Sequence, residues 1–220
     1  MPQDAPKTEI ASQAHKGDGD KLIAPSALRN MDPIRDLMLQ VAPPRGRALE
    51  IASGTGQHVV AFARALPDLQ WQPTEPQAER RASIDAYGRE AGLANLAPAL
   101  DLDAAQPGWA ARLGPRDLIV LINLLHLIPM AQVETLIAEA ARALAPGGRL
   151  VVYGPFMRAG ELTSDGDARF HASLVESDPL IGYKDDFDII DRMQAAGLML
   201  MQAIEMPANN LALIAERPGG

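Results

Sequence analysis

The sequence contains no cysteine, which excludes disulfide bonds, thiolate metal sites, iron–sulfur clusters and a cysteine nucleophile. It also lacks an excess of positive charge: its formal net charge is −8. Because an acidic surface repels a phosphodiester backbone, we expect no nucleic-acid partner. The four histidines show no paired short spacing, so we expect no metal.

Long hydrophobic segments are missing as well. The longest apolar run, LIVLINLLHLI at 118–128, is too short for a membrane span and contains Asn123 and His126. Residues 1–21 are polar and lack the apolar stretch of a targeting signal. We therefore expect a cytoplasmic protein with no membrane partner.

Short apolar runs alternate with helical patterns along most of the 220 residues. Strands are predicted at 47–52, 69–75, 96–103, 117–123, 149–156, 198–206 and 210–217. Helices are predicted within 26–44, 57–66, 77–91, 132–144, 167–176 and 187–197. This alternation predicts an α/β fold: a doubly wound, mostly parallel, seven-stranded Rossmann-like sheet with helices on both faces and a C-terminal antiparallel hairpin strand.

Two segments depart from this rhythm. Residues 1–24 are expected to form a disordered or loosely attached arm, and residues 25–220 a single domain whose first helix is capped by Ser26 or Asp32. Residues 157–185 are rich in glycine, aspartate and serine, and we expect them to cover a substrate. The pocket under this segment is expected to be lined by Phe156, Phe170 and Tyr183. Its polar groups are expected to come from Asp165, Asp167 and His171.

The stretch LEIASGTGQHV places an acid, Glu50, just before a glycine turn. Gly54 and Gly56 follow a predicted strand and open a helix, but Ala52 and Val59 stand where a dinucleotide fingerprint has glycine. A carboxylate here repels a pyrophosphate and attracts an ammonium or sulfonium group. S-adenosylmethionine (SAM) carries both cations and no phosphate, so Glu50 favours SAM over NAD.

Two further acids fit the prediction that the ligand is SAM. Glu75 follows the second predicted strand, 19 residues after Gly56, where a carboxylate binds ribose hydroxyls. Asp103 follows the third predicted strand and is expected to accept a hydrogen bond from the adenine amino group. Leu102 is expected beside the adenine ring, while Asp101 alternates to the other side.

These segments together resemble a class I SAM-dependent methyltransferase over residues 26–217. The shared features are LEIASGTG, the acid Glu75, LDLD, DLIVLINLLH and LAPGGRLVVYG. A narrower set, RNMDPI, ASGTGQH, WQPTE, YGPF and MPANN, is similar to the small methyltransferase-like family catalogued as a domain of unknown function. The resemblance implies the SAM fold and methyl transfer with S-adenosylhomocysteine (SAH) as product. It supplies no substrate, and Ala52 departs from the superfamily, where glycine is common.

Methyl transfer is an in-line displacement in which the protein mainly aligns the reacting atoms. The candidate catalytic residues are His126, to orient or deprotonate an acceptor, and Tyr153, expected to end the fifth strand. A histidine packed against backbone is an equal alternative for His126. The residues expected to bind the cofactor are Arg29, Asn30, Glu50, Ala52, Ser53, Gly54, Gly56, Gln57, His58, Glu75, Leu102, Asp103 and Asn123.

The sequence therefore predicts a SAM-dependent methyltransferase acting on a small molecule. One alternative is a SAM-binding or partner-scaffolding module without catalysis, because no residue is an unambiguous base. Another is an NAD-dependent oxidoreductase, disfavoured by the missing third glycine and by Glu50. The acceptor atom and the oligomeric state stay open.

Overall fold

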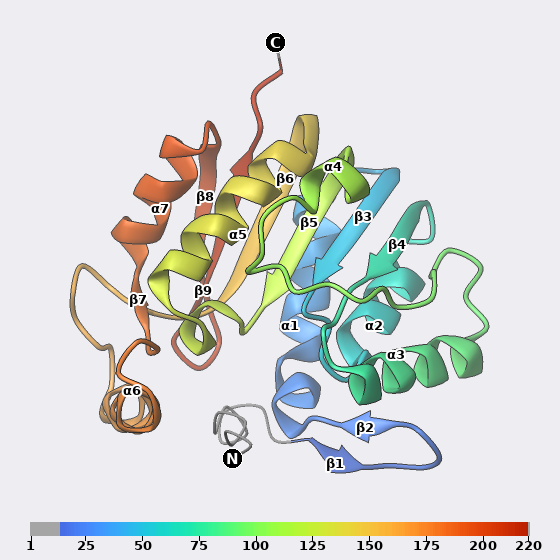
Figure 1. Cartoon of the computed structure of the whole chain (residues 1–220), viewed down its shortest axis with the longest axis horizontal. Helices are drawn as coiled ribbons and strands as arrows, with labels where there is room; N and C mark the ends of the chain where they lie inside the picture. The colour runs from blue at the N-terminus through green and yellow to red at the C-terminus, as the bar shows by residue number, and fades with distance from the viewer. Residues whose placement is uncertain (1–13, 220) are drawn as a thin grey trace, which may run out of the picture.

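The computed structural model of the chain describes residues 14–219. Within them, a seven-stranded sheet has the order β4-β3-β5-β6-β9-β8, and β7 pairs with β6 beside this path (Figure 1). β3 to β6 run parallel, whereas β9 is antiparallel to both β6 and β8. The predicted doubly wound sheet with an antiparallel C-terminal hairpin is thus confirmed. The strands are β3 Gly46–Ile51, β4 Leu69–Pro73, β5 Arg116–Ile122, β6 Leu144–Met157, β7 Lys184–Asp185, β8 Met199–Met206 and β9 Asn210–Glu216.

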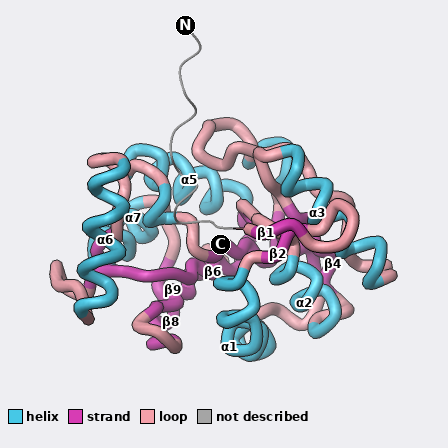
Figure 2. The backbone as a smooth tube through the Cα atoms, turned by 90° about the horizontal axis from the view of Figure 1, so that it is seen from below, coloured by secondary structure: helices cyan, strands magenta, loops and turns pink. Residues whose placement is uncertain are grey.

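Helices cover both faces of the sheet: α1 and α2 lie on one side, and α5 and α7 on the other (Figures 1 and 2). The alternating side chains of β5 show why. Leu118 and Val120 pack with residues of α1 and α2, while Ile119 and Leu121 pack with α5 and α7. Each buried side chain of this kind contributes about 1.5–3 kcal/mol. The helices are α1 Pro25–Val41, α2 Gln57–Ala65, α3 Ala78–Ala91, α4 Ala110–Leu113, α5 Met130–Ala143, α6 Asp165–Ser177, α7 Asp186–Ala195 and the 3-10 turn η2 Leu125–Leu127.

Two local predictions are wrong. Residues 96–103 do not form a strand but make isolated parallel bridges, from Leu96 to Trp71 of β4 and from Leu100 to Thr74 just after it. Pro98 lies between these bridges and has no N–H for a ladder bond. The start of α1 also differs, because Ala24 is the N-cap without a side-chain hydrogen bond and Pro25 fills the first turn. Neither Ser26 nor Asp32 caps this helix.

Residues 14–24 are attached to the domain, contrary to the expected loose arm. β1 (His15–Lys16) and β2 (Leu22–Ile23) form a small hairpin. The Leu22 N–H donates to Ser83 Oγ of α3 at 2.8 Å, and Lys21 pairs with Glu90. The rest of the predicted arm, residues 1–13, lies outside the described residues.

The parallel strands all end at the lower edge of the sheet in Figure 1. The β1–β2 hairpin lies beyond this edge on one side and α6 on the other. In doubly wound sheets, ligands bind in the crevice outside the carboxyl ends of the strands. No helix in the described part of the chain is long and apolar enough to cross a membrane.

Candidate functional site

A tight turn joins β3 to α2 at the carboxyl edge. Ala52, Gly54 and Gly56 adopt φ values of 52°, 57° and 92°. At Gly56 an added Cβ would lie 2.7 Å from the Cα of Ile84, so α3 approaches too closely for any other residue. Ala52 takes a left-handed conformation without being glycine, which costs about 1 kcal/mol or more.

Glu75 follows β4 and anchors this turn. It is buried, and its Oε2 accepts a hydrogen bond from the Gly54 N–H at 3.0 Å. Its Oε1 accepts from the Gln77 N–H at 3.2 Å. Burial raises the pKa of Glu75 above its ordinary value. The carboxylate therefore lies next to the glycine turn.

Glu50 is the second-to-last residue of β3, just before the glycine turn, and is only 2% exposed. Its Oε2 has no hydrogen-bond partner among the described residues. Burial raises the pKa of Glu50 to about 8, and the nearby Glu75 acts in the same direction. Two adjacent acids have raised pKa values, and one of them holds an unpaired buried oxygen; a cationic ligand stabilises the ionised form of such a group.

A cavity of about 380 Å³ opens where β5 and β6 end; neither the glycine turn nor Glu50 or Glu75 is among the residues that line it. Asn123 closes β5 with a left-handed φ of 55°, and its side chain lines the cavity. Pockets for small ligands begin at about 300 Å³. Residues of α1, the β5 exit, the β6 exit, α6 and the β8–β9 turn build the wall: Pro25, Ser26, Arg29, Asn123, His126, Pro155, Phe170, Tyr183, Ala208 and Asn210.

His126 lies in η2 and lines this cavity while being 5% exposed. Its ring meets Phe170 and Tyr183 edge to face, with centroids 5.8 and 6.2 Å apart. Burial lowers the pKa of His126 to about 3, and the positive charge of Lys184 adds to this effect. The imidazole is therefore neutral and can form hydrogen bonds, but it is a weak base.

A hydrogen-bond hub fastens α6 over the cavity. Asp167 Oδ1 accepts from the Tyr183 hydroxyl at 3.0 Å, and Oδ2 accepts from Asn209 Nδ2 at 3.0 Å. Thr163 and Ser164 also donate to Oδ2, and together these bonds lower the pKa of Asp167. We call Asp167, Tyr183 and Asn209 the α6 latch. It joins the 157–185 segment to the β8–β9 turn, and Phe170 and Tyr183 of that segment line the cavity.

Three residues expected near a ligand lie in the core instead. β6 runs to Met157, so Tyr153 lies inside the strand, opposite Ala212 of β9, and is 2% exposed. Phe156 and Leu102 belong to the apolar cluster under α5 and α7. The prediction that Tyr153 ends a strand is therefore wrong.

Several other expected residues form local hydrogen bonds. Gln57 Oε1 accepts from the Ala24 N–H at 2.8 Å and from the Thr55 hydroxyl, so it links the start of α1 to the start of α2. Ser53 Oγ donates to the Glu50 carbonyl at 3.3 Å. Asp103 is exposed and accepts from the Ala105 N–H at 3.0 Å within a turn.

The remaining two lie on helices. His58 is buried at the start of α2 against Phe62, and its Nδ1 lacks a hydrogen-bond partner among the described residues. A solvent-facing position for His58 is thereby excluded. Asn30 is half-buried on α1 and, unlike its neighbour Arg29, does not line the cavity.

The sequence reasoning missed Lys184. It is 7% exposed, its Nζ donates to the Gly182 carbonyl at 2.9 Å, and burial lowers its pKa to about 8. Nothing in GYKDDF separates a buried lysine from a surface one, since the segment has neither strand nor helix periodicity.

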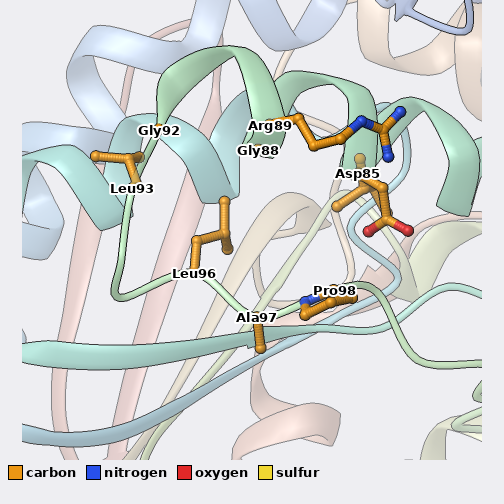
Figure 3. Close-up of a pocket in the computed structure, with 9 residues that line it drawn as sticks. Asp85, Gly88, Arg89, Gly92, Leu93, Leu96, Ala97 and Pro98 are labelled. Carbon is orange, nitrogen blue, oxygen red and sulfur yellow. The ribbon is translucent and has the colours of Figure 1, made fainter.

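A second cavity, of about 420 Å³, lies between α3 and the segment that follows it (Figure 3). Its wall includes Asp85, Arg89, Leu93 and Leu96. None of the predicted site residues lines it, so it is not the candidate site. Within residues 14–219, no group of three or more His, Cys, Asp or Glu residues is placed to hold a metal ion.

The chain is similar to one known protein family and to several solved structures. The family described as "Protein of unknown function (DUF938)" matches residues 21–217. An O-methyltransferase family protein from Burkholderia thailandensis superposes with a TM-score of 0.76 and 19% identity, over 89% of this chain and 58% of that one. An O-methyltransferase family 2 protein from Planctomyces limnophilus, solved in complex with apigenin, gives 0.71 and 19%, over 83% and 56%.

A third solved structure is CalO1, a methyltransferase in calicheamicin biosynthesis, in its SAH-bound form. It gives a TM-score of 0.71 and 15% identity, over 89% of this chain and 54% of that one. The chain thus spans between 54% and 58% of the length of these three proteins. At these identities the likeness establishes a methyltransferase-type Rossmann-like fold.

Proposed function

The chain belongs to the DUF938 family, and we propose that it is a SAM-dependent methyltransferase that transfers a methyl group to a small molecule by in-line displacement. The observation that carries this proposal is the unpaired, buried Oε2 of Glu50 beside Glu75 at the glycine turn. A ligand with an ammonium and a sulfonium group stabilises the ionised form of Glu50, whereas the pyrophosphate of a dinucleotide opposes it.

Three acids and the glycine turn bind different parts of this ligand. Glu75 serves the ribose hydroxyls, Glu50 the cationic end, and the Gly54–Gly56 turn gives close backbone access. Asp103 serves the adenine amino group, in exchange for its present bond to Ala105. When bound, SAM supplies a methyl group that is already activated for displacement.

The cavity at the β5 exit receives the acceptor. Asn123 and His126 orient it through hydrogen bonds, and Phe170 and Tyr183 exclude water from one side. The net charge of −8 favours a small molecule over a nucleic acid. Among proteins of the same fold, the one from Planctomyces limnophilus was solved with apigenin, which is a small molecule.

Calorimetric titration of the protein with SAM, SAH and NADH tests the proposal. We expect SAM and SAH to bind and NADH not to bind, because NADH carries a pyrophosphate. Binding of NADH without binding of SAM or SAH would show that the chain is a dinucleotide-binding protein, and the proposal would be abandoned.

A second function, SAM binding without catalysis, is favoured by one observation. His126, with a pKa of about 3, is a poor general base. Incubating the protein with methyl-labelled SAM and pools of small metabolites separates the two functions. Incorporation of label establishes transfer, whereas SAM binding with no label in any pool would favour a sensing or scaffolding module.

A further inference from the structure

The candidate acceptor cavity is positively charged inside an acidic protein. Among the described residues that line it, Arg29 is the only lysine or arginine, and none is acidic. No ion pair is formed by Arg29 within residues 14–219. The protein as a whole has a formal net charge of −8, so the charge of this cavity wall is opposite in sign to that of the protein.

A second cation lies behind the cavity wall. Lys184 follows Tyr183, is 7% exposed, and acts electrostatically on both His126 and His171. Its Nζ bonds to the Gly182 carbonyl, and no carboxylate pairs with it in the described part of the chain. A buried ammonium without a counter-charge is costly, and an anion in the cavity lowers that cost.

Two carboxylates near the cavity wall are engaged with other partners. Asp167 lies behind Tyr183 and accepts four side-chain hydrogen bonds, two of them from the α6 latch partners Tyr183 and Asn209. Glu205, near the β8–β9 turn, pairs with Arg158 at 3.1 Å. Neither acid forms an ion pair with Arg29 or Lys184.

The wall also restricts the chemistry of the acceptor. Phe170, Tyr183 and His126 meet edge to face, which leaves an apolar, ring-lined side suited to a flat molecule. An amine acceptor becomes an ammonium on methylation, and the nearby cations oppose that charge. A neutral hydroxyl must lose a proton, and the lining offers only a weakly basic imidazole.

Building on the proposed function, we infer that the acceptor is a small aromatic acid whose ionised oxygen, a carboxylate or phenolate, is methylated in this cavity beside Arg29 and Lys184. The oxygen lone pair forms the new O–CH3 bond, and the methyl–sulfur bond breaks with its electron pair on sulfur. An anion and a sulfonium become a neutral ester or ether and a neutral thioether. No proton is released, so no base is needed.

Matched ligand pairs test this inference. Benzoate and 4-nitrophenolate are compared with benzamide and methyl benzoate by calorimetry, with and without saturating SAH. We expect each anion to bind at least about tenfold more tightly than the neutral molecules, a difference of about 1.4 kcal/mol. Neutral molecules binding as tightly as the anions would overturn the inference. Failure of SAH to bind would instead count against the proposed function, since the anion preference is also measured without it.

Product analysis separates the two oxygen classes. With labelled SAM, a methylated carboxylate is an ester that alkali hydrolyses to labelled methanol, whereas a methylated phenolate is an ether that survives alkali. Label found only on amine acceptors would contradict the inference.

Variants locate the source of the preference. Lys184→Met removes the buried charge and should lower the anion preference about tenfold, while Lys184→Arg keeps it. Arg29→Gln should lower it similarly, and Arg35→Gln, a surface change on the same helix, should leave it unchanged. If Lys184→Met and Arg29→Gln both keep the full preference, these cations do not create it and the inference fails.

Discussion

The backbone N–H of Gly54 donates to Oε2 of Glu75 at 3.0 Å, so an acid that follows one strand fastens the glycine turn that follows its neighbour. The second carboxylate oxygen accepts from the Gln77 N–H. Glu75 is held in place by these two bonds, which reduces the ordering cost when a ribose binds.

Glu75→Gln should weaken SAH binding by about ten- to a hundredfold, since hydrogen bonds to a charged group are worth about 1.5–3 kcal/mol. The amide can still accept from Gly54, so the fold should persist. Calorimetric titration with SAH measures the loss. Glu79→Gln, an exposed change in the first turn of α3, serves as the control, and equal affinities of the two variants would exclude a ribose role for Glu75.

Glu50→Gln should stabilise the ligand-free protein, and more so as pH rises. The pKa of Glu50 is raised from 4.5 to about 8 in the folded state, so its contribution to stability is fully present below about pH 4.5 and is lost as pH rises through 8. A glutamine has no proton to lose. Thermal unfolding should show a Tm gain over wild type that is small at pH 5 and clearly larger at pH 8, about 2–4 °C per kcal/mol. A Tm gain that does not change with pH would contradict the raised pKa of Glu50.

The same group predicts a proton release on cofactor binding. A cation beside Glu50 lowers its pKa, so SAM binding near pH 7 should expel a proton and strengthen as pH rises towards 8. Titrations in two buffers of different ionisation enthalpy measure the proton directly. Glu50→Gln should show none, and a wild-type protein that releases no proton would place the cationic end of the ligand elsewhere.

Features of the fold and the site that depend on residues close together in the sequence could be predicted, whereas features that depend on pairing between distant segments could not. LIVLIN shows directly that β5 is covered on both faces, and the glycines and Glu75 sit at fixed offsets from strand ends. Tyr153 was misplaced although the predicted strand ran to residue 156, because β6 stays paired beyond it, with β9 more than 50 residues later. Lys184 and the α6 latch depend on how 157–185 folds back over the sheet edge, which no periodicity encodes.

Gly56→Ala and Gly54→Ala should behave differently although both glycines have positive φ. At Gly56 the added Cβ meets the backbone of α3 at 2.7 Å, so the helix must move and the protein should lose at least about 2 kcal/mol of stability. At Gly54 the nearest atom is 3.9 Å away, on Arg80, so only the strain of about 1 kcal/mol is expected.

Denaturant unfolding of the two variants measures these losses, and SAH titration of Gly54→Ala measures access to the turn. Gly54→Ala should stay folded and still bind SAH less tightly, because its methyl group narrows the backbone approach. Equal stability losses in the two variants would show that contact with α3 is not what requires glycine at position 56.

Asp167→Ala should loosen α6 over the cavity. The change leaves the Tyr183 hydroxyl and the Asn209 amide without their acceptor, at a cost of about 1–3 kcal/mol. Tyr183→Phe removes only one donor and should cost about 0.5–1.5 kcal/mol.

Hydrogen exchange of the α6 amides measures the effect of both variants. Protection should fall strongly in Asp167→Ala and less in Tyr183→Phe, while the β5 amides stay protected. Since the two residues share one bond, the double variant should lose less than the sum of the single losses. Additive losses, or equal loss of protection in α6 and β5, would show that the α6 latch does not act as a local fastening of the cavity cover.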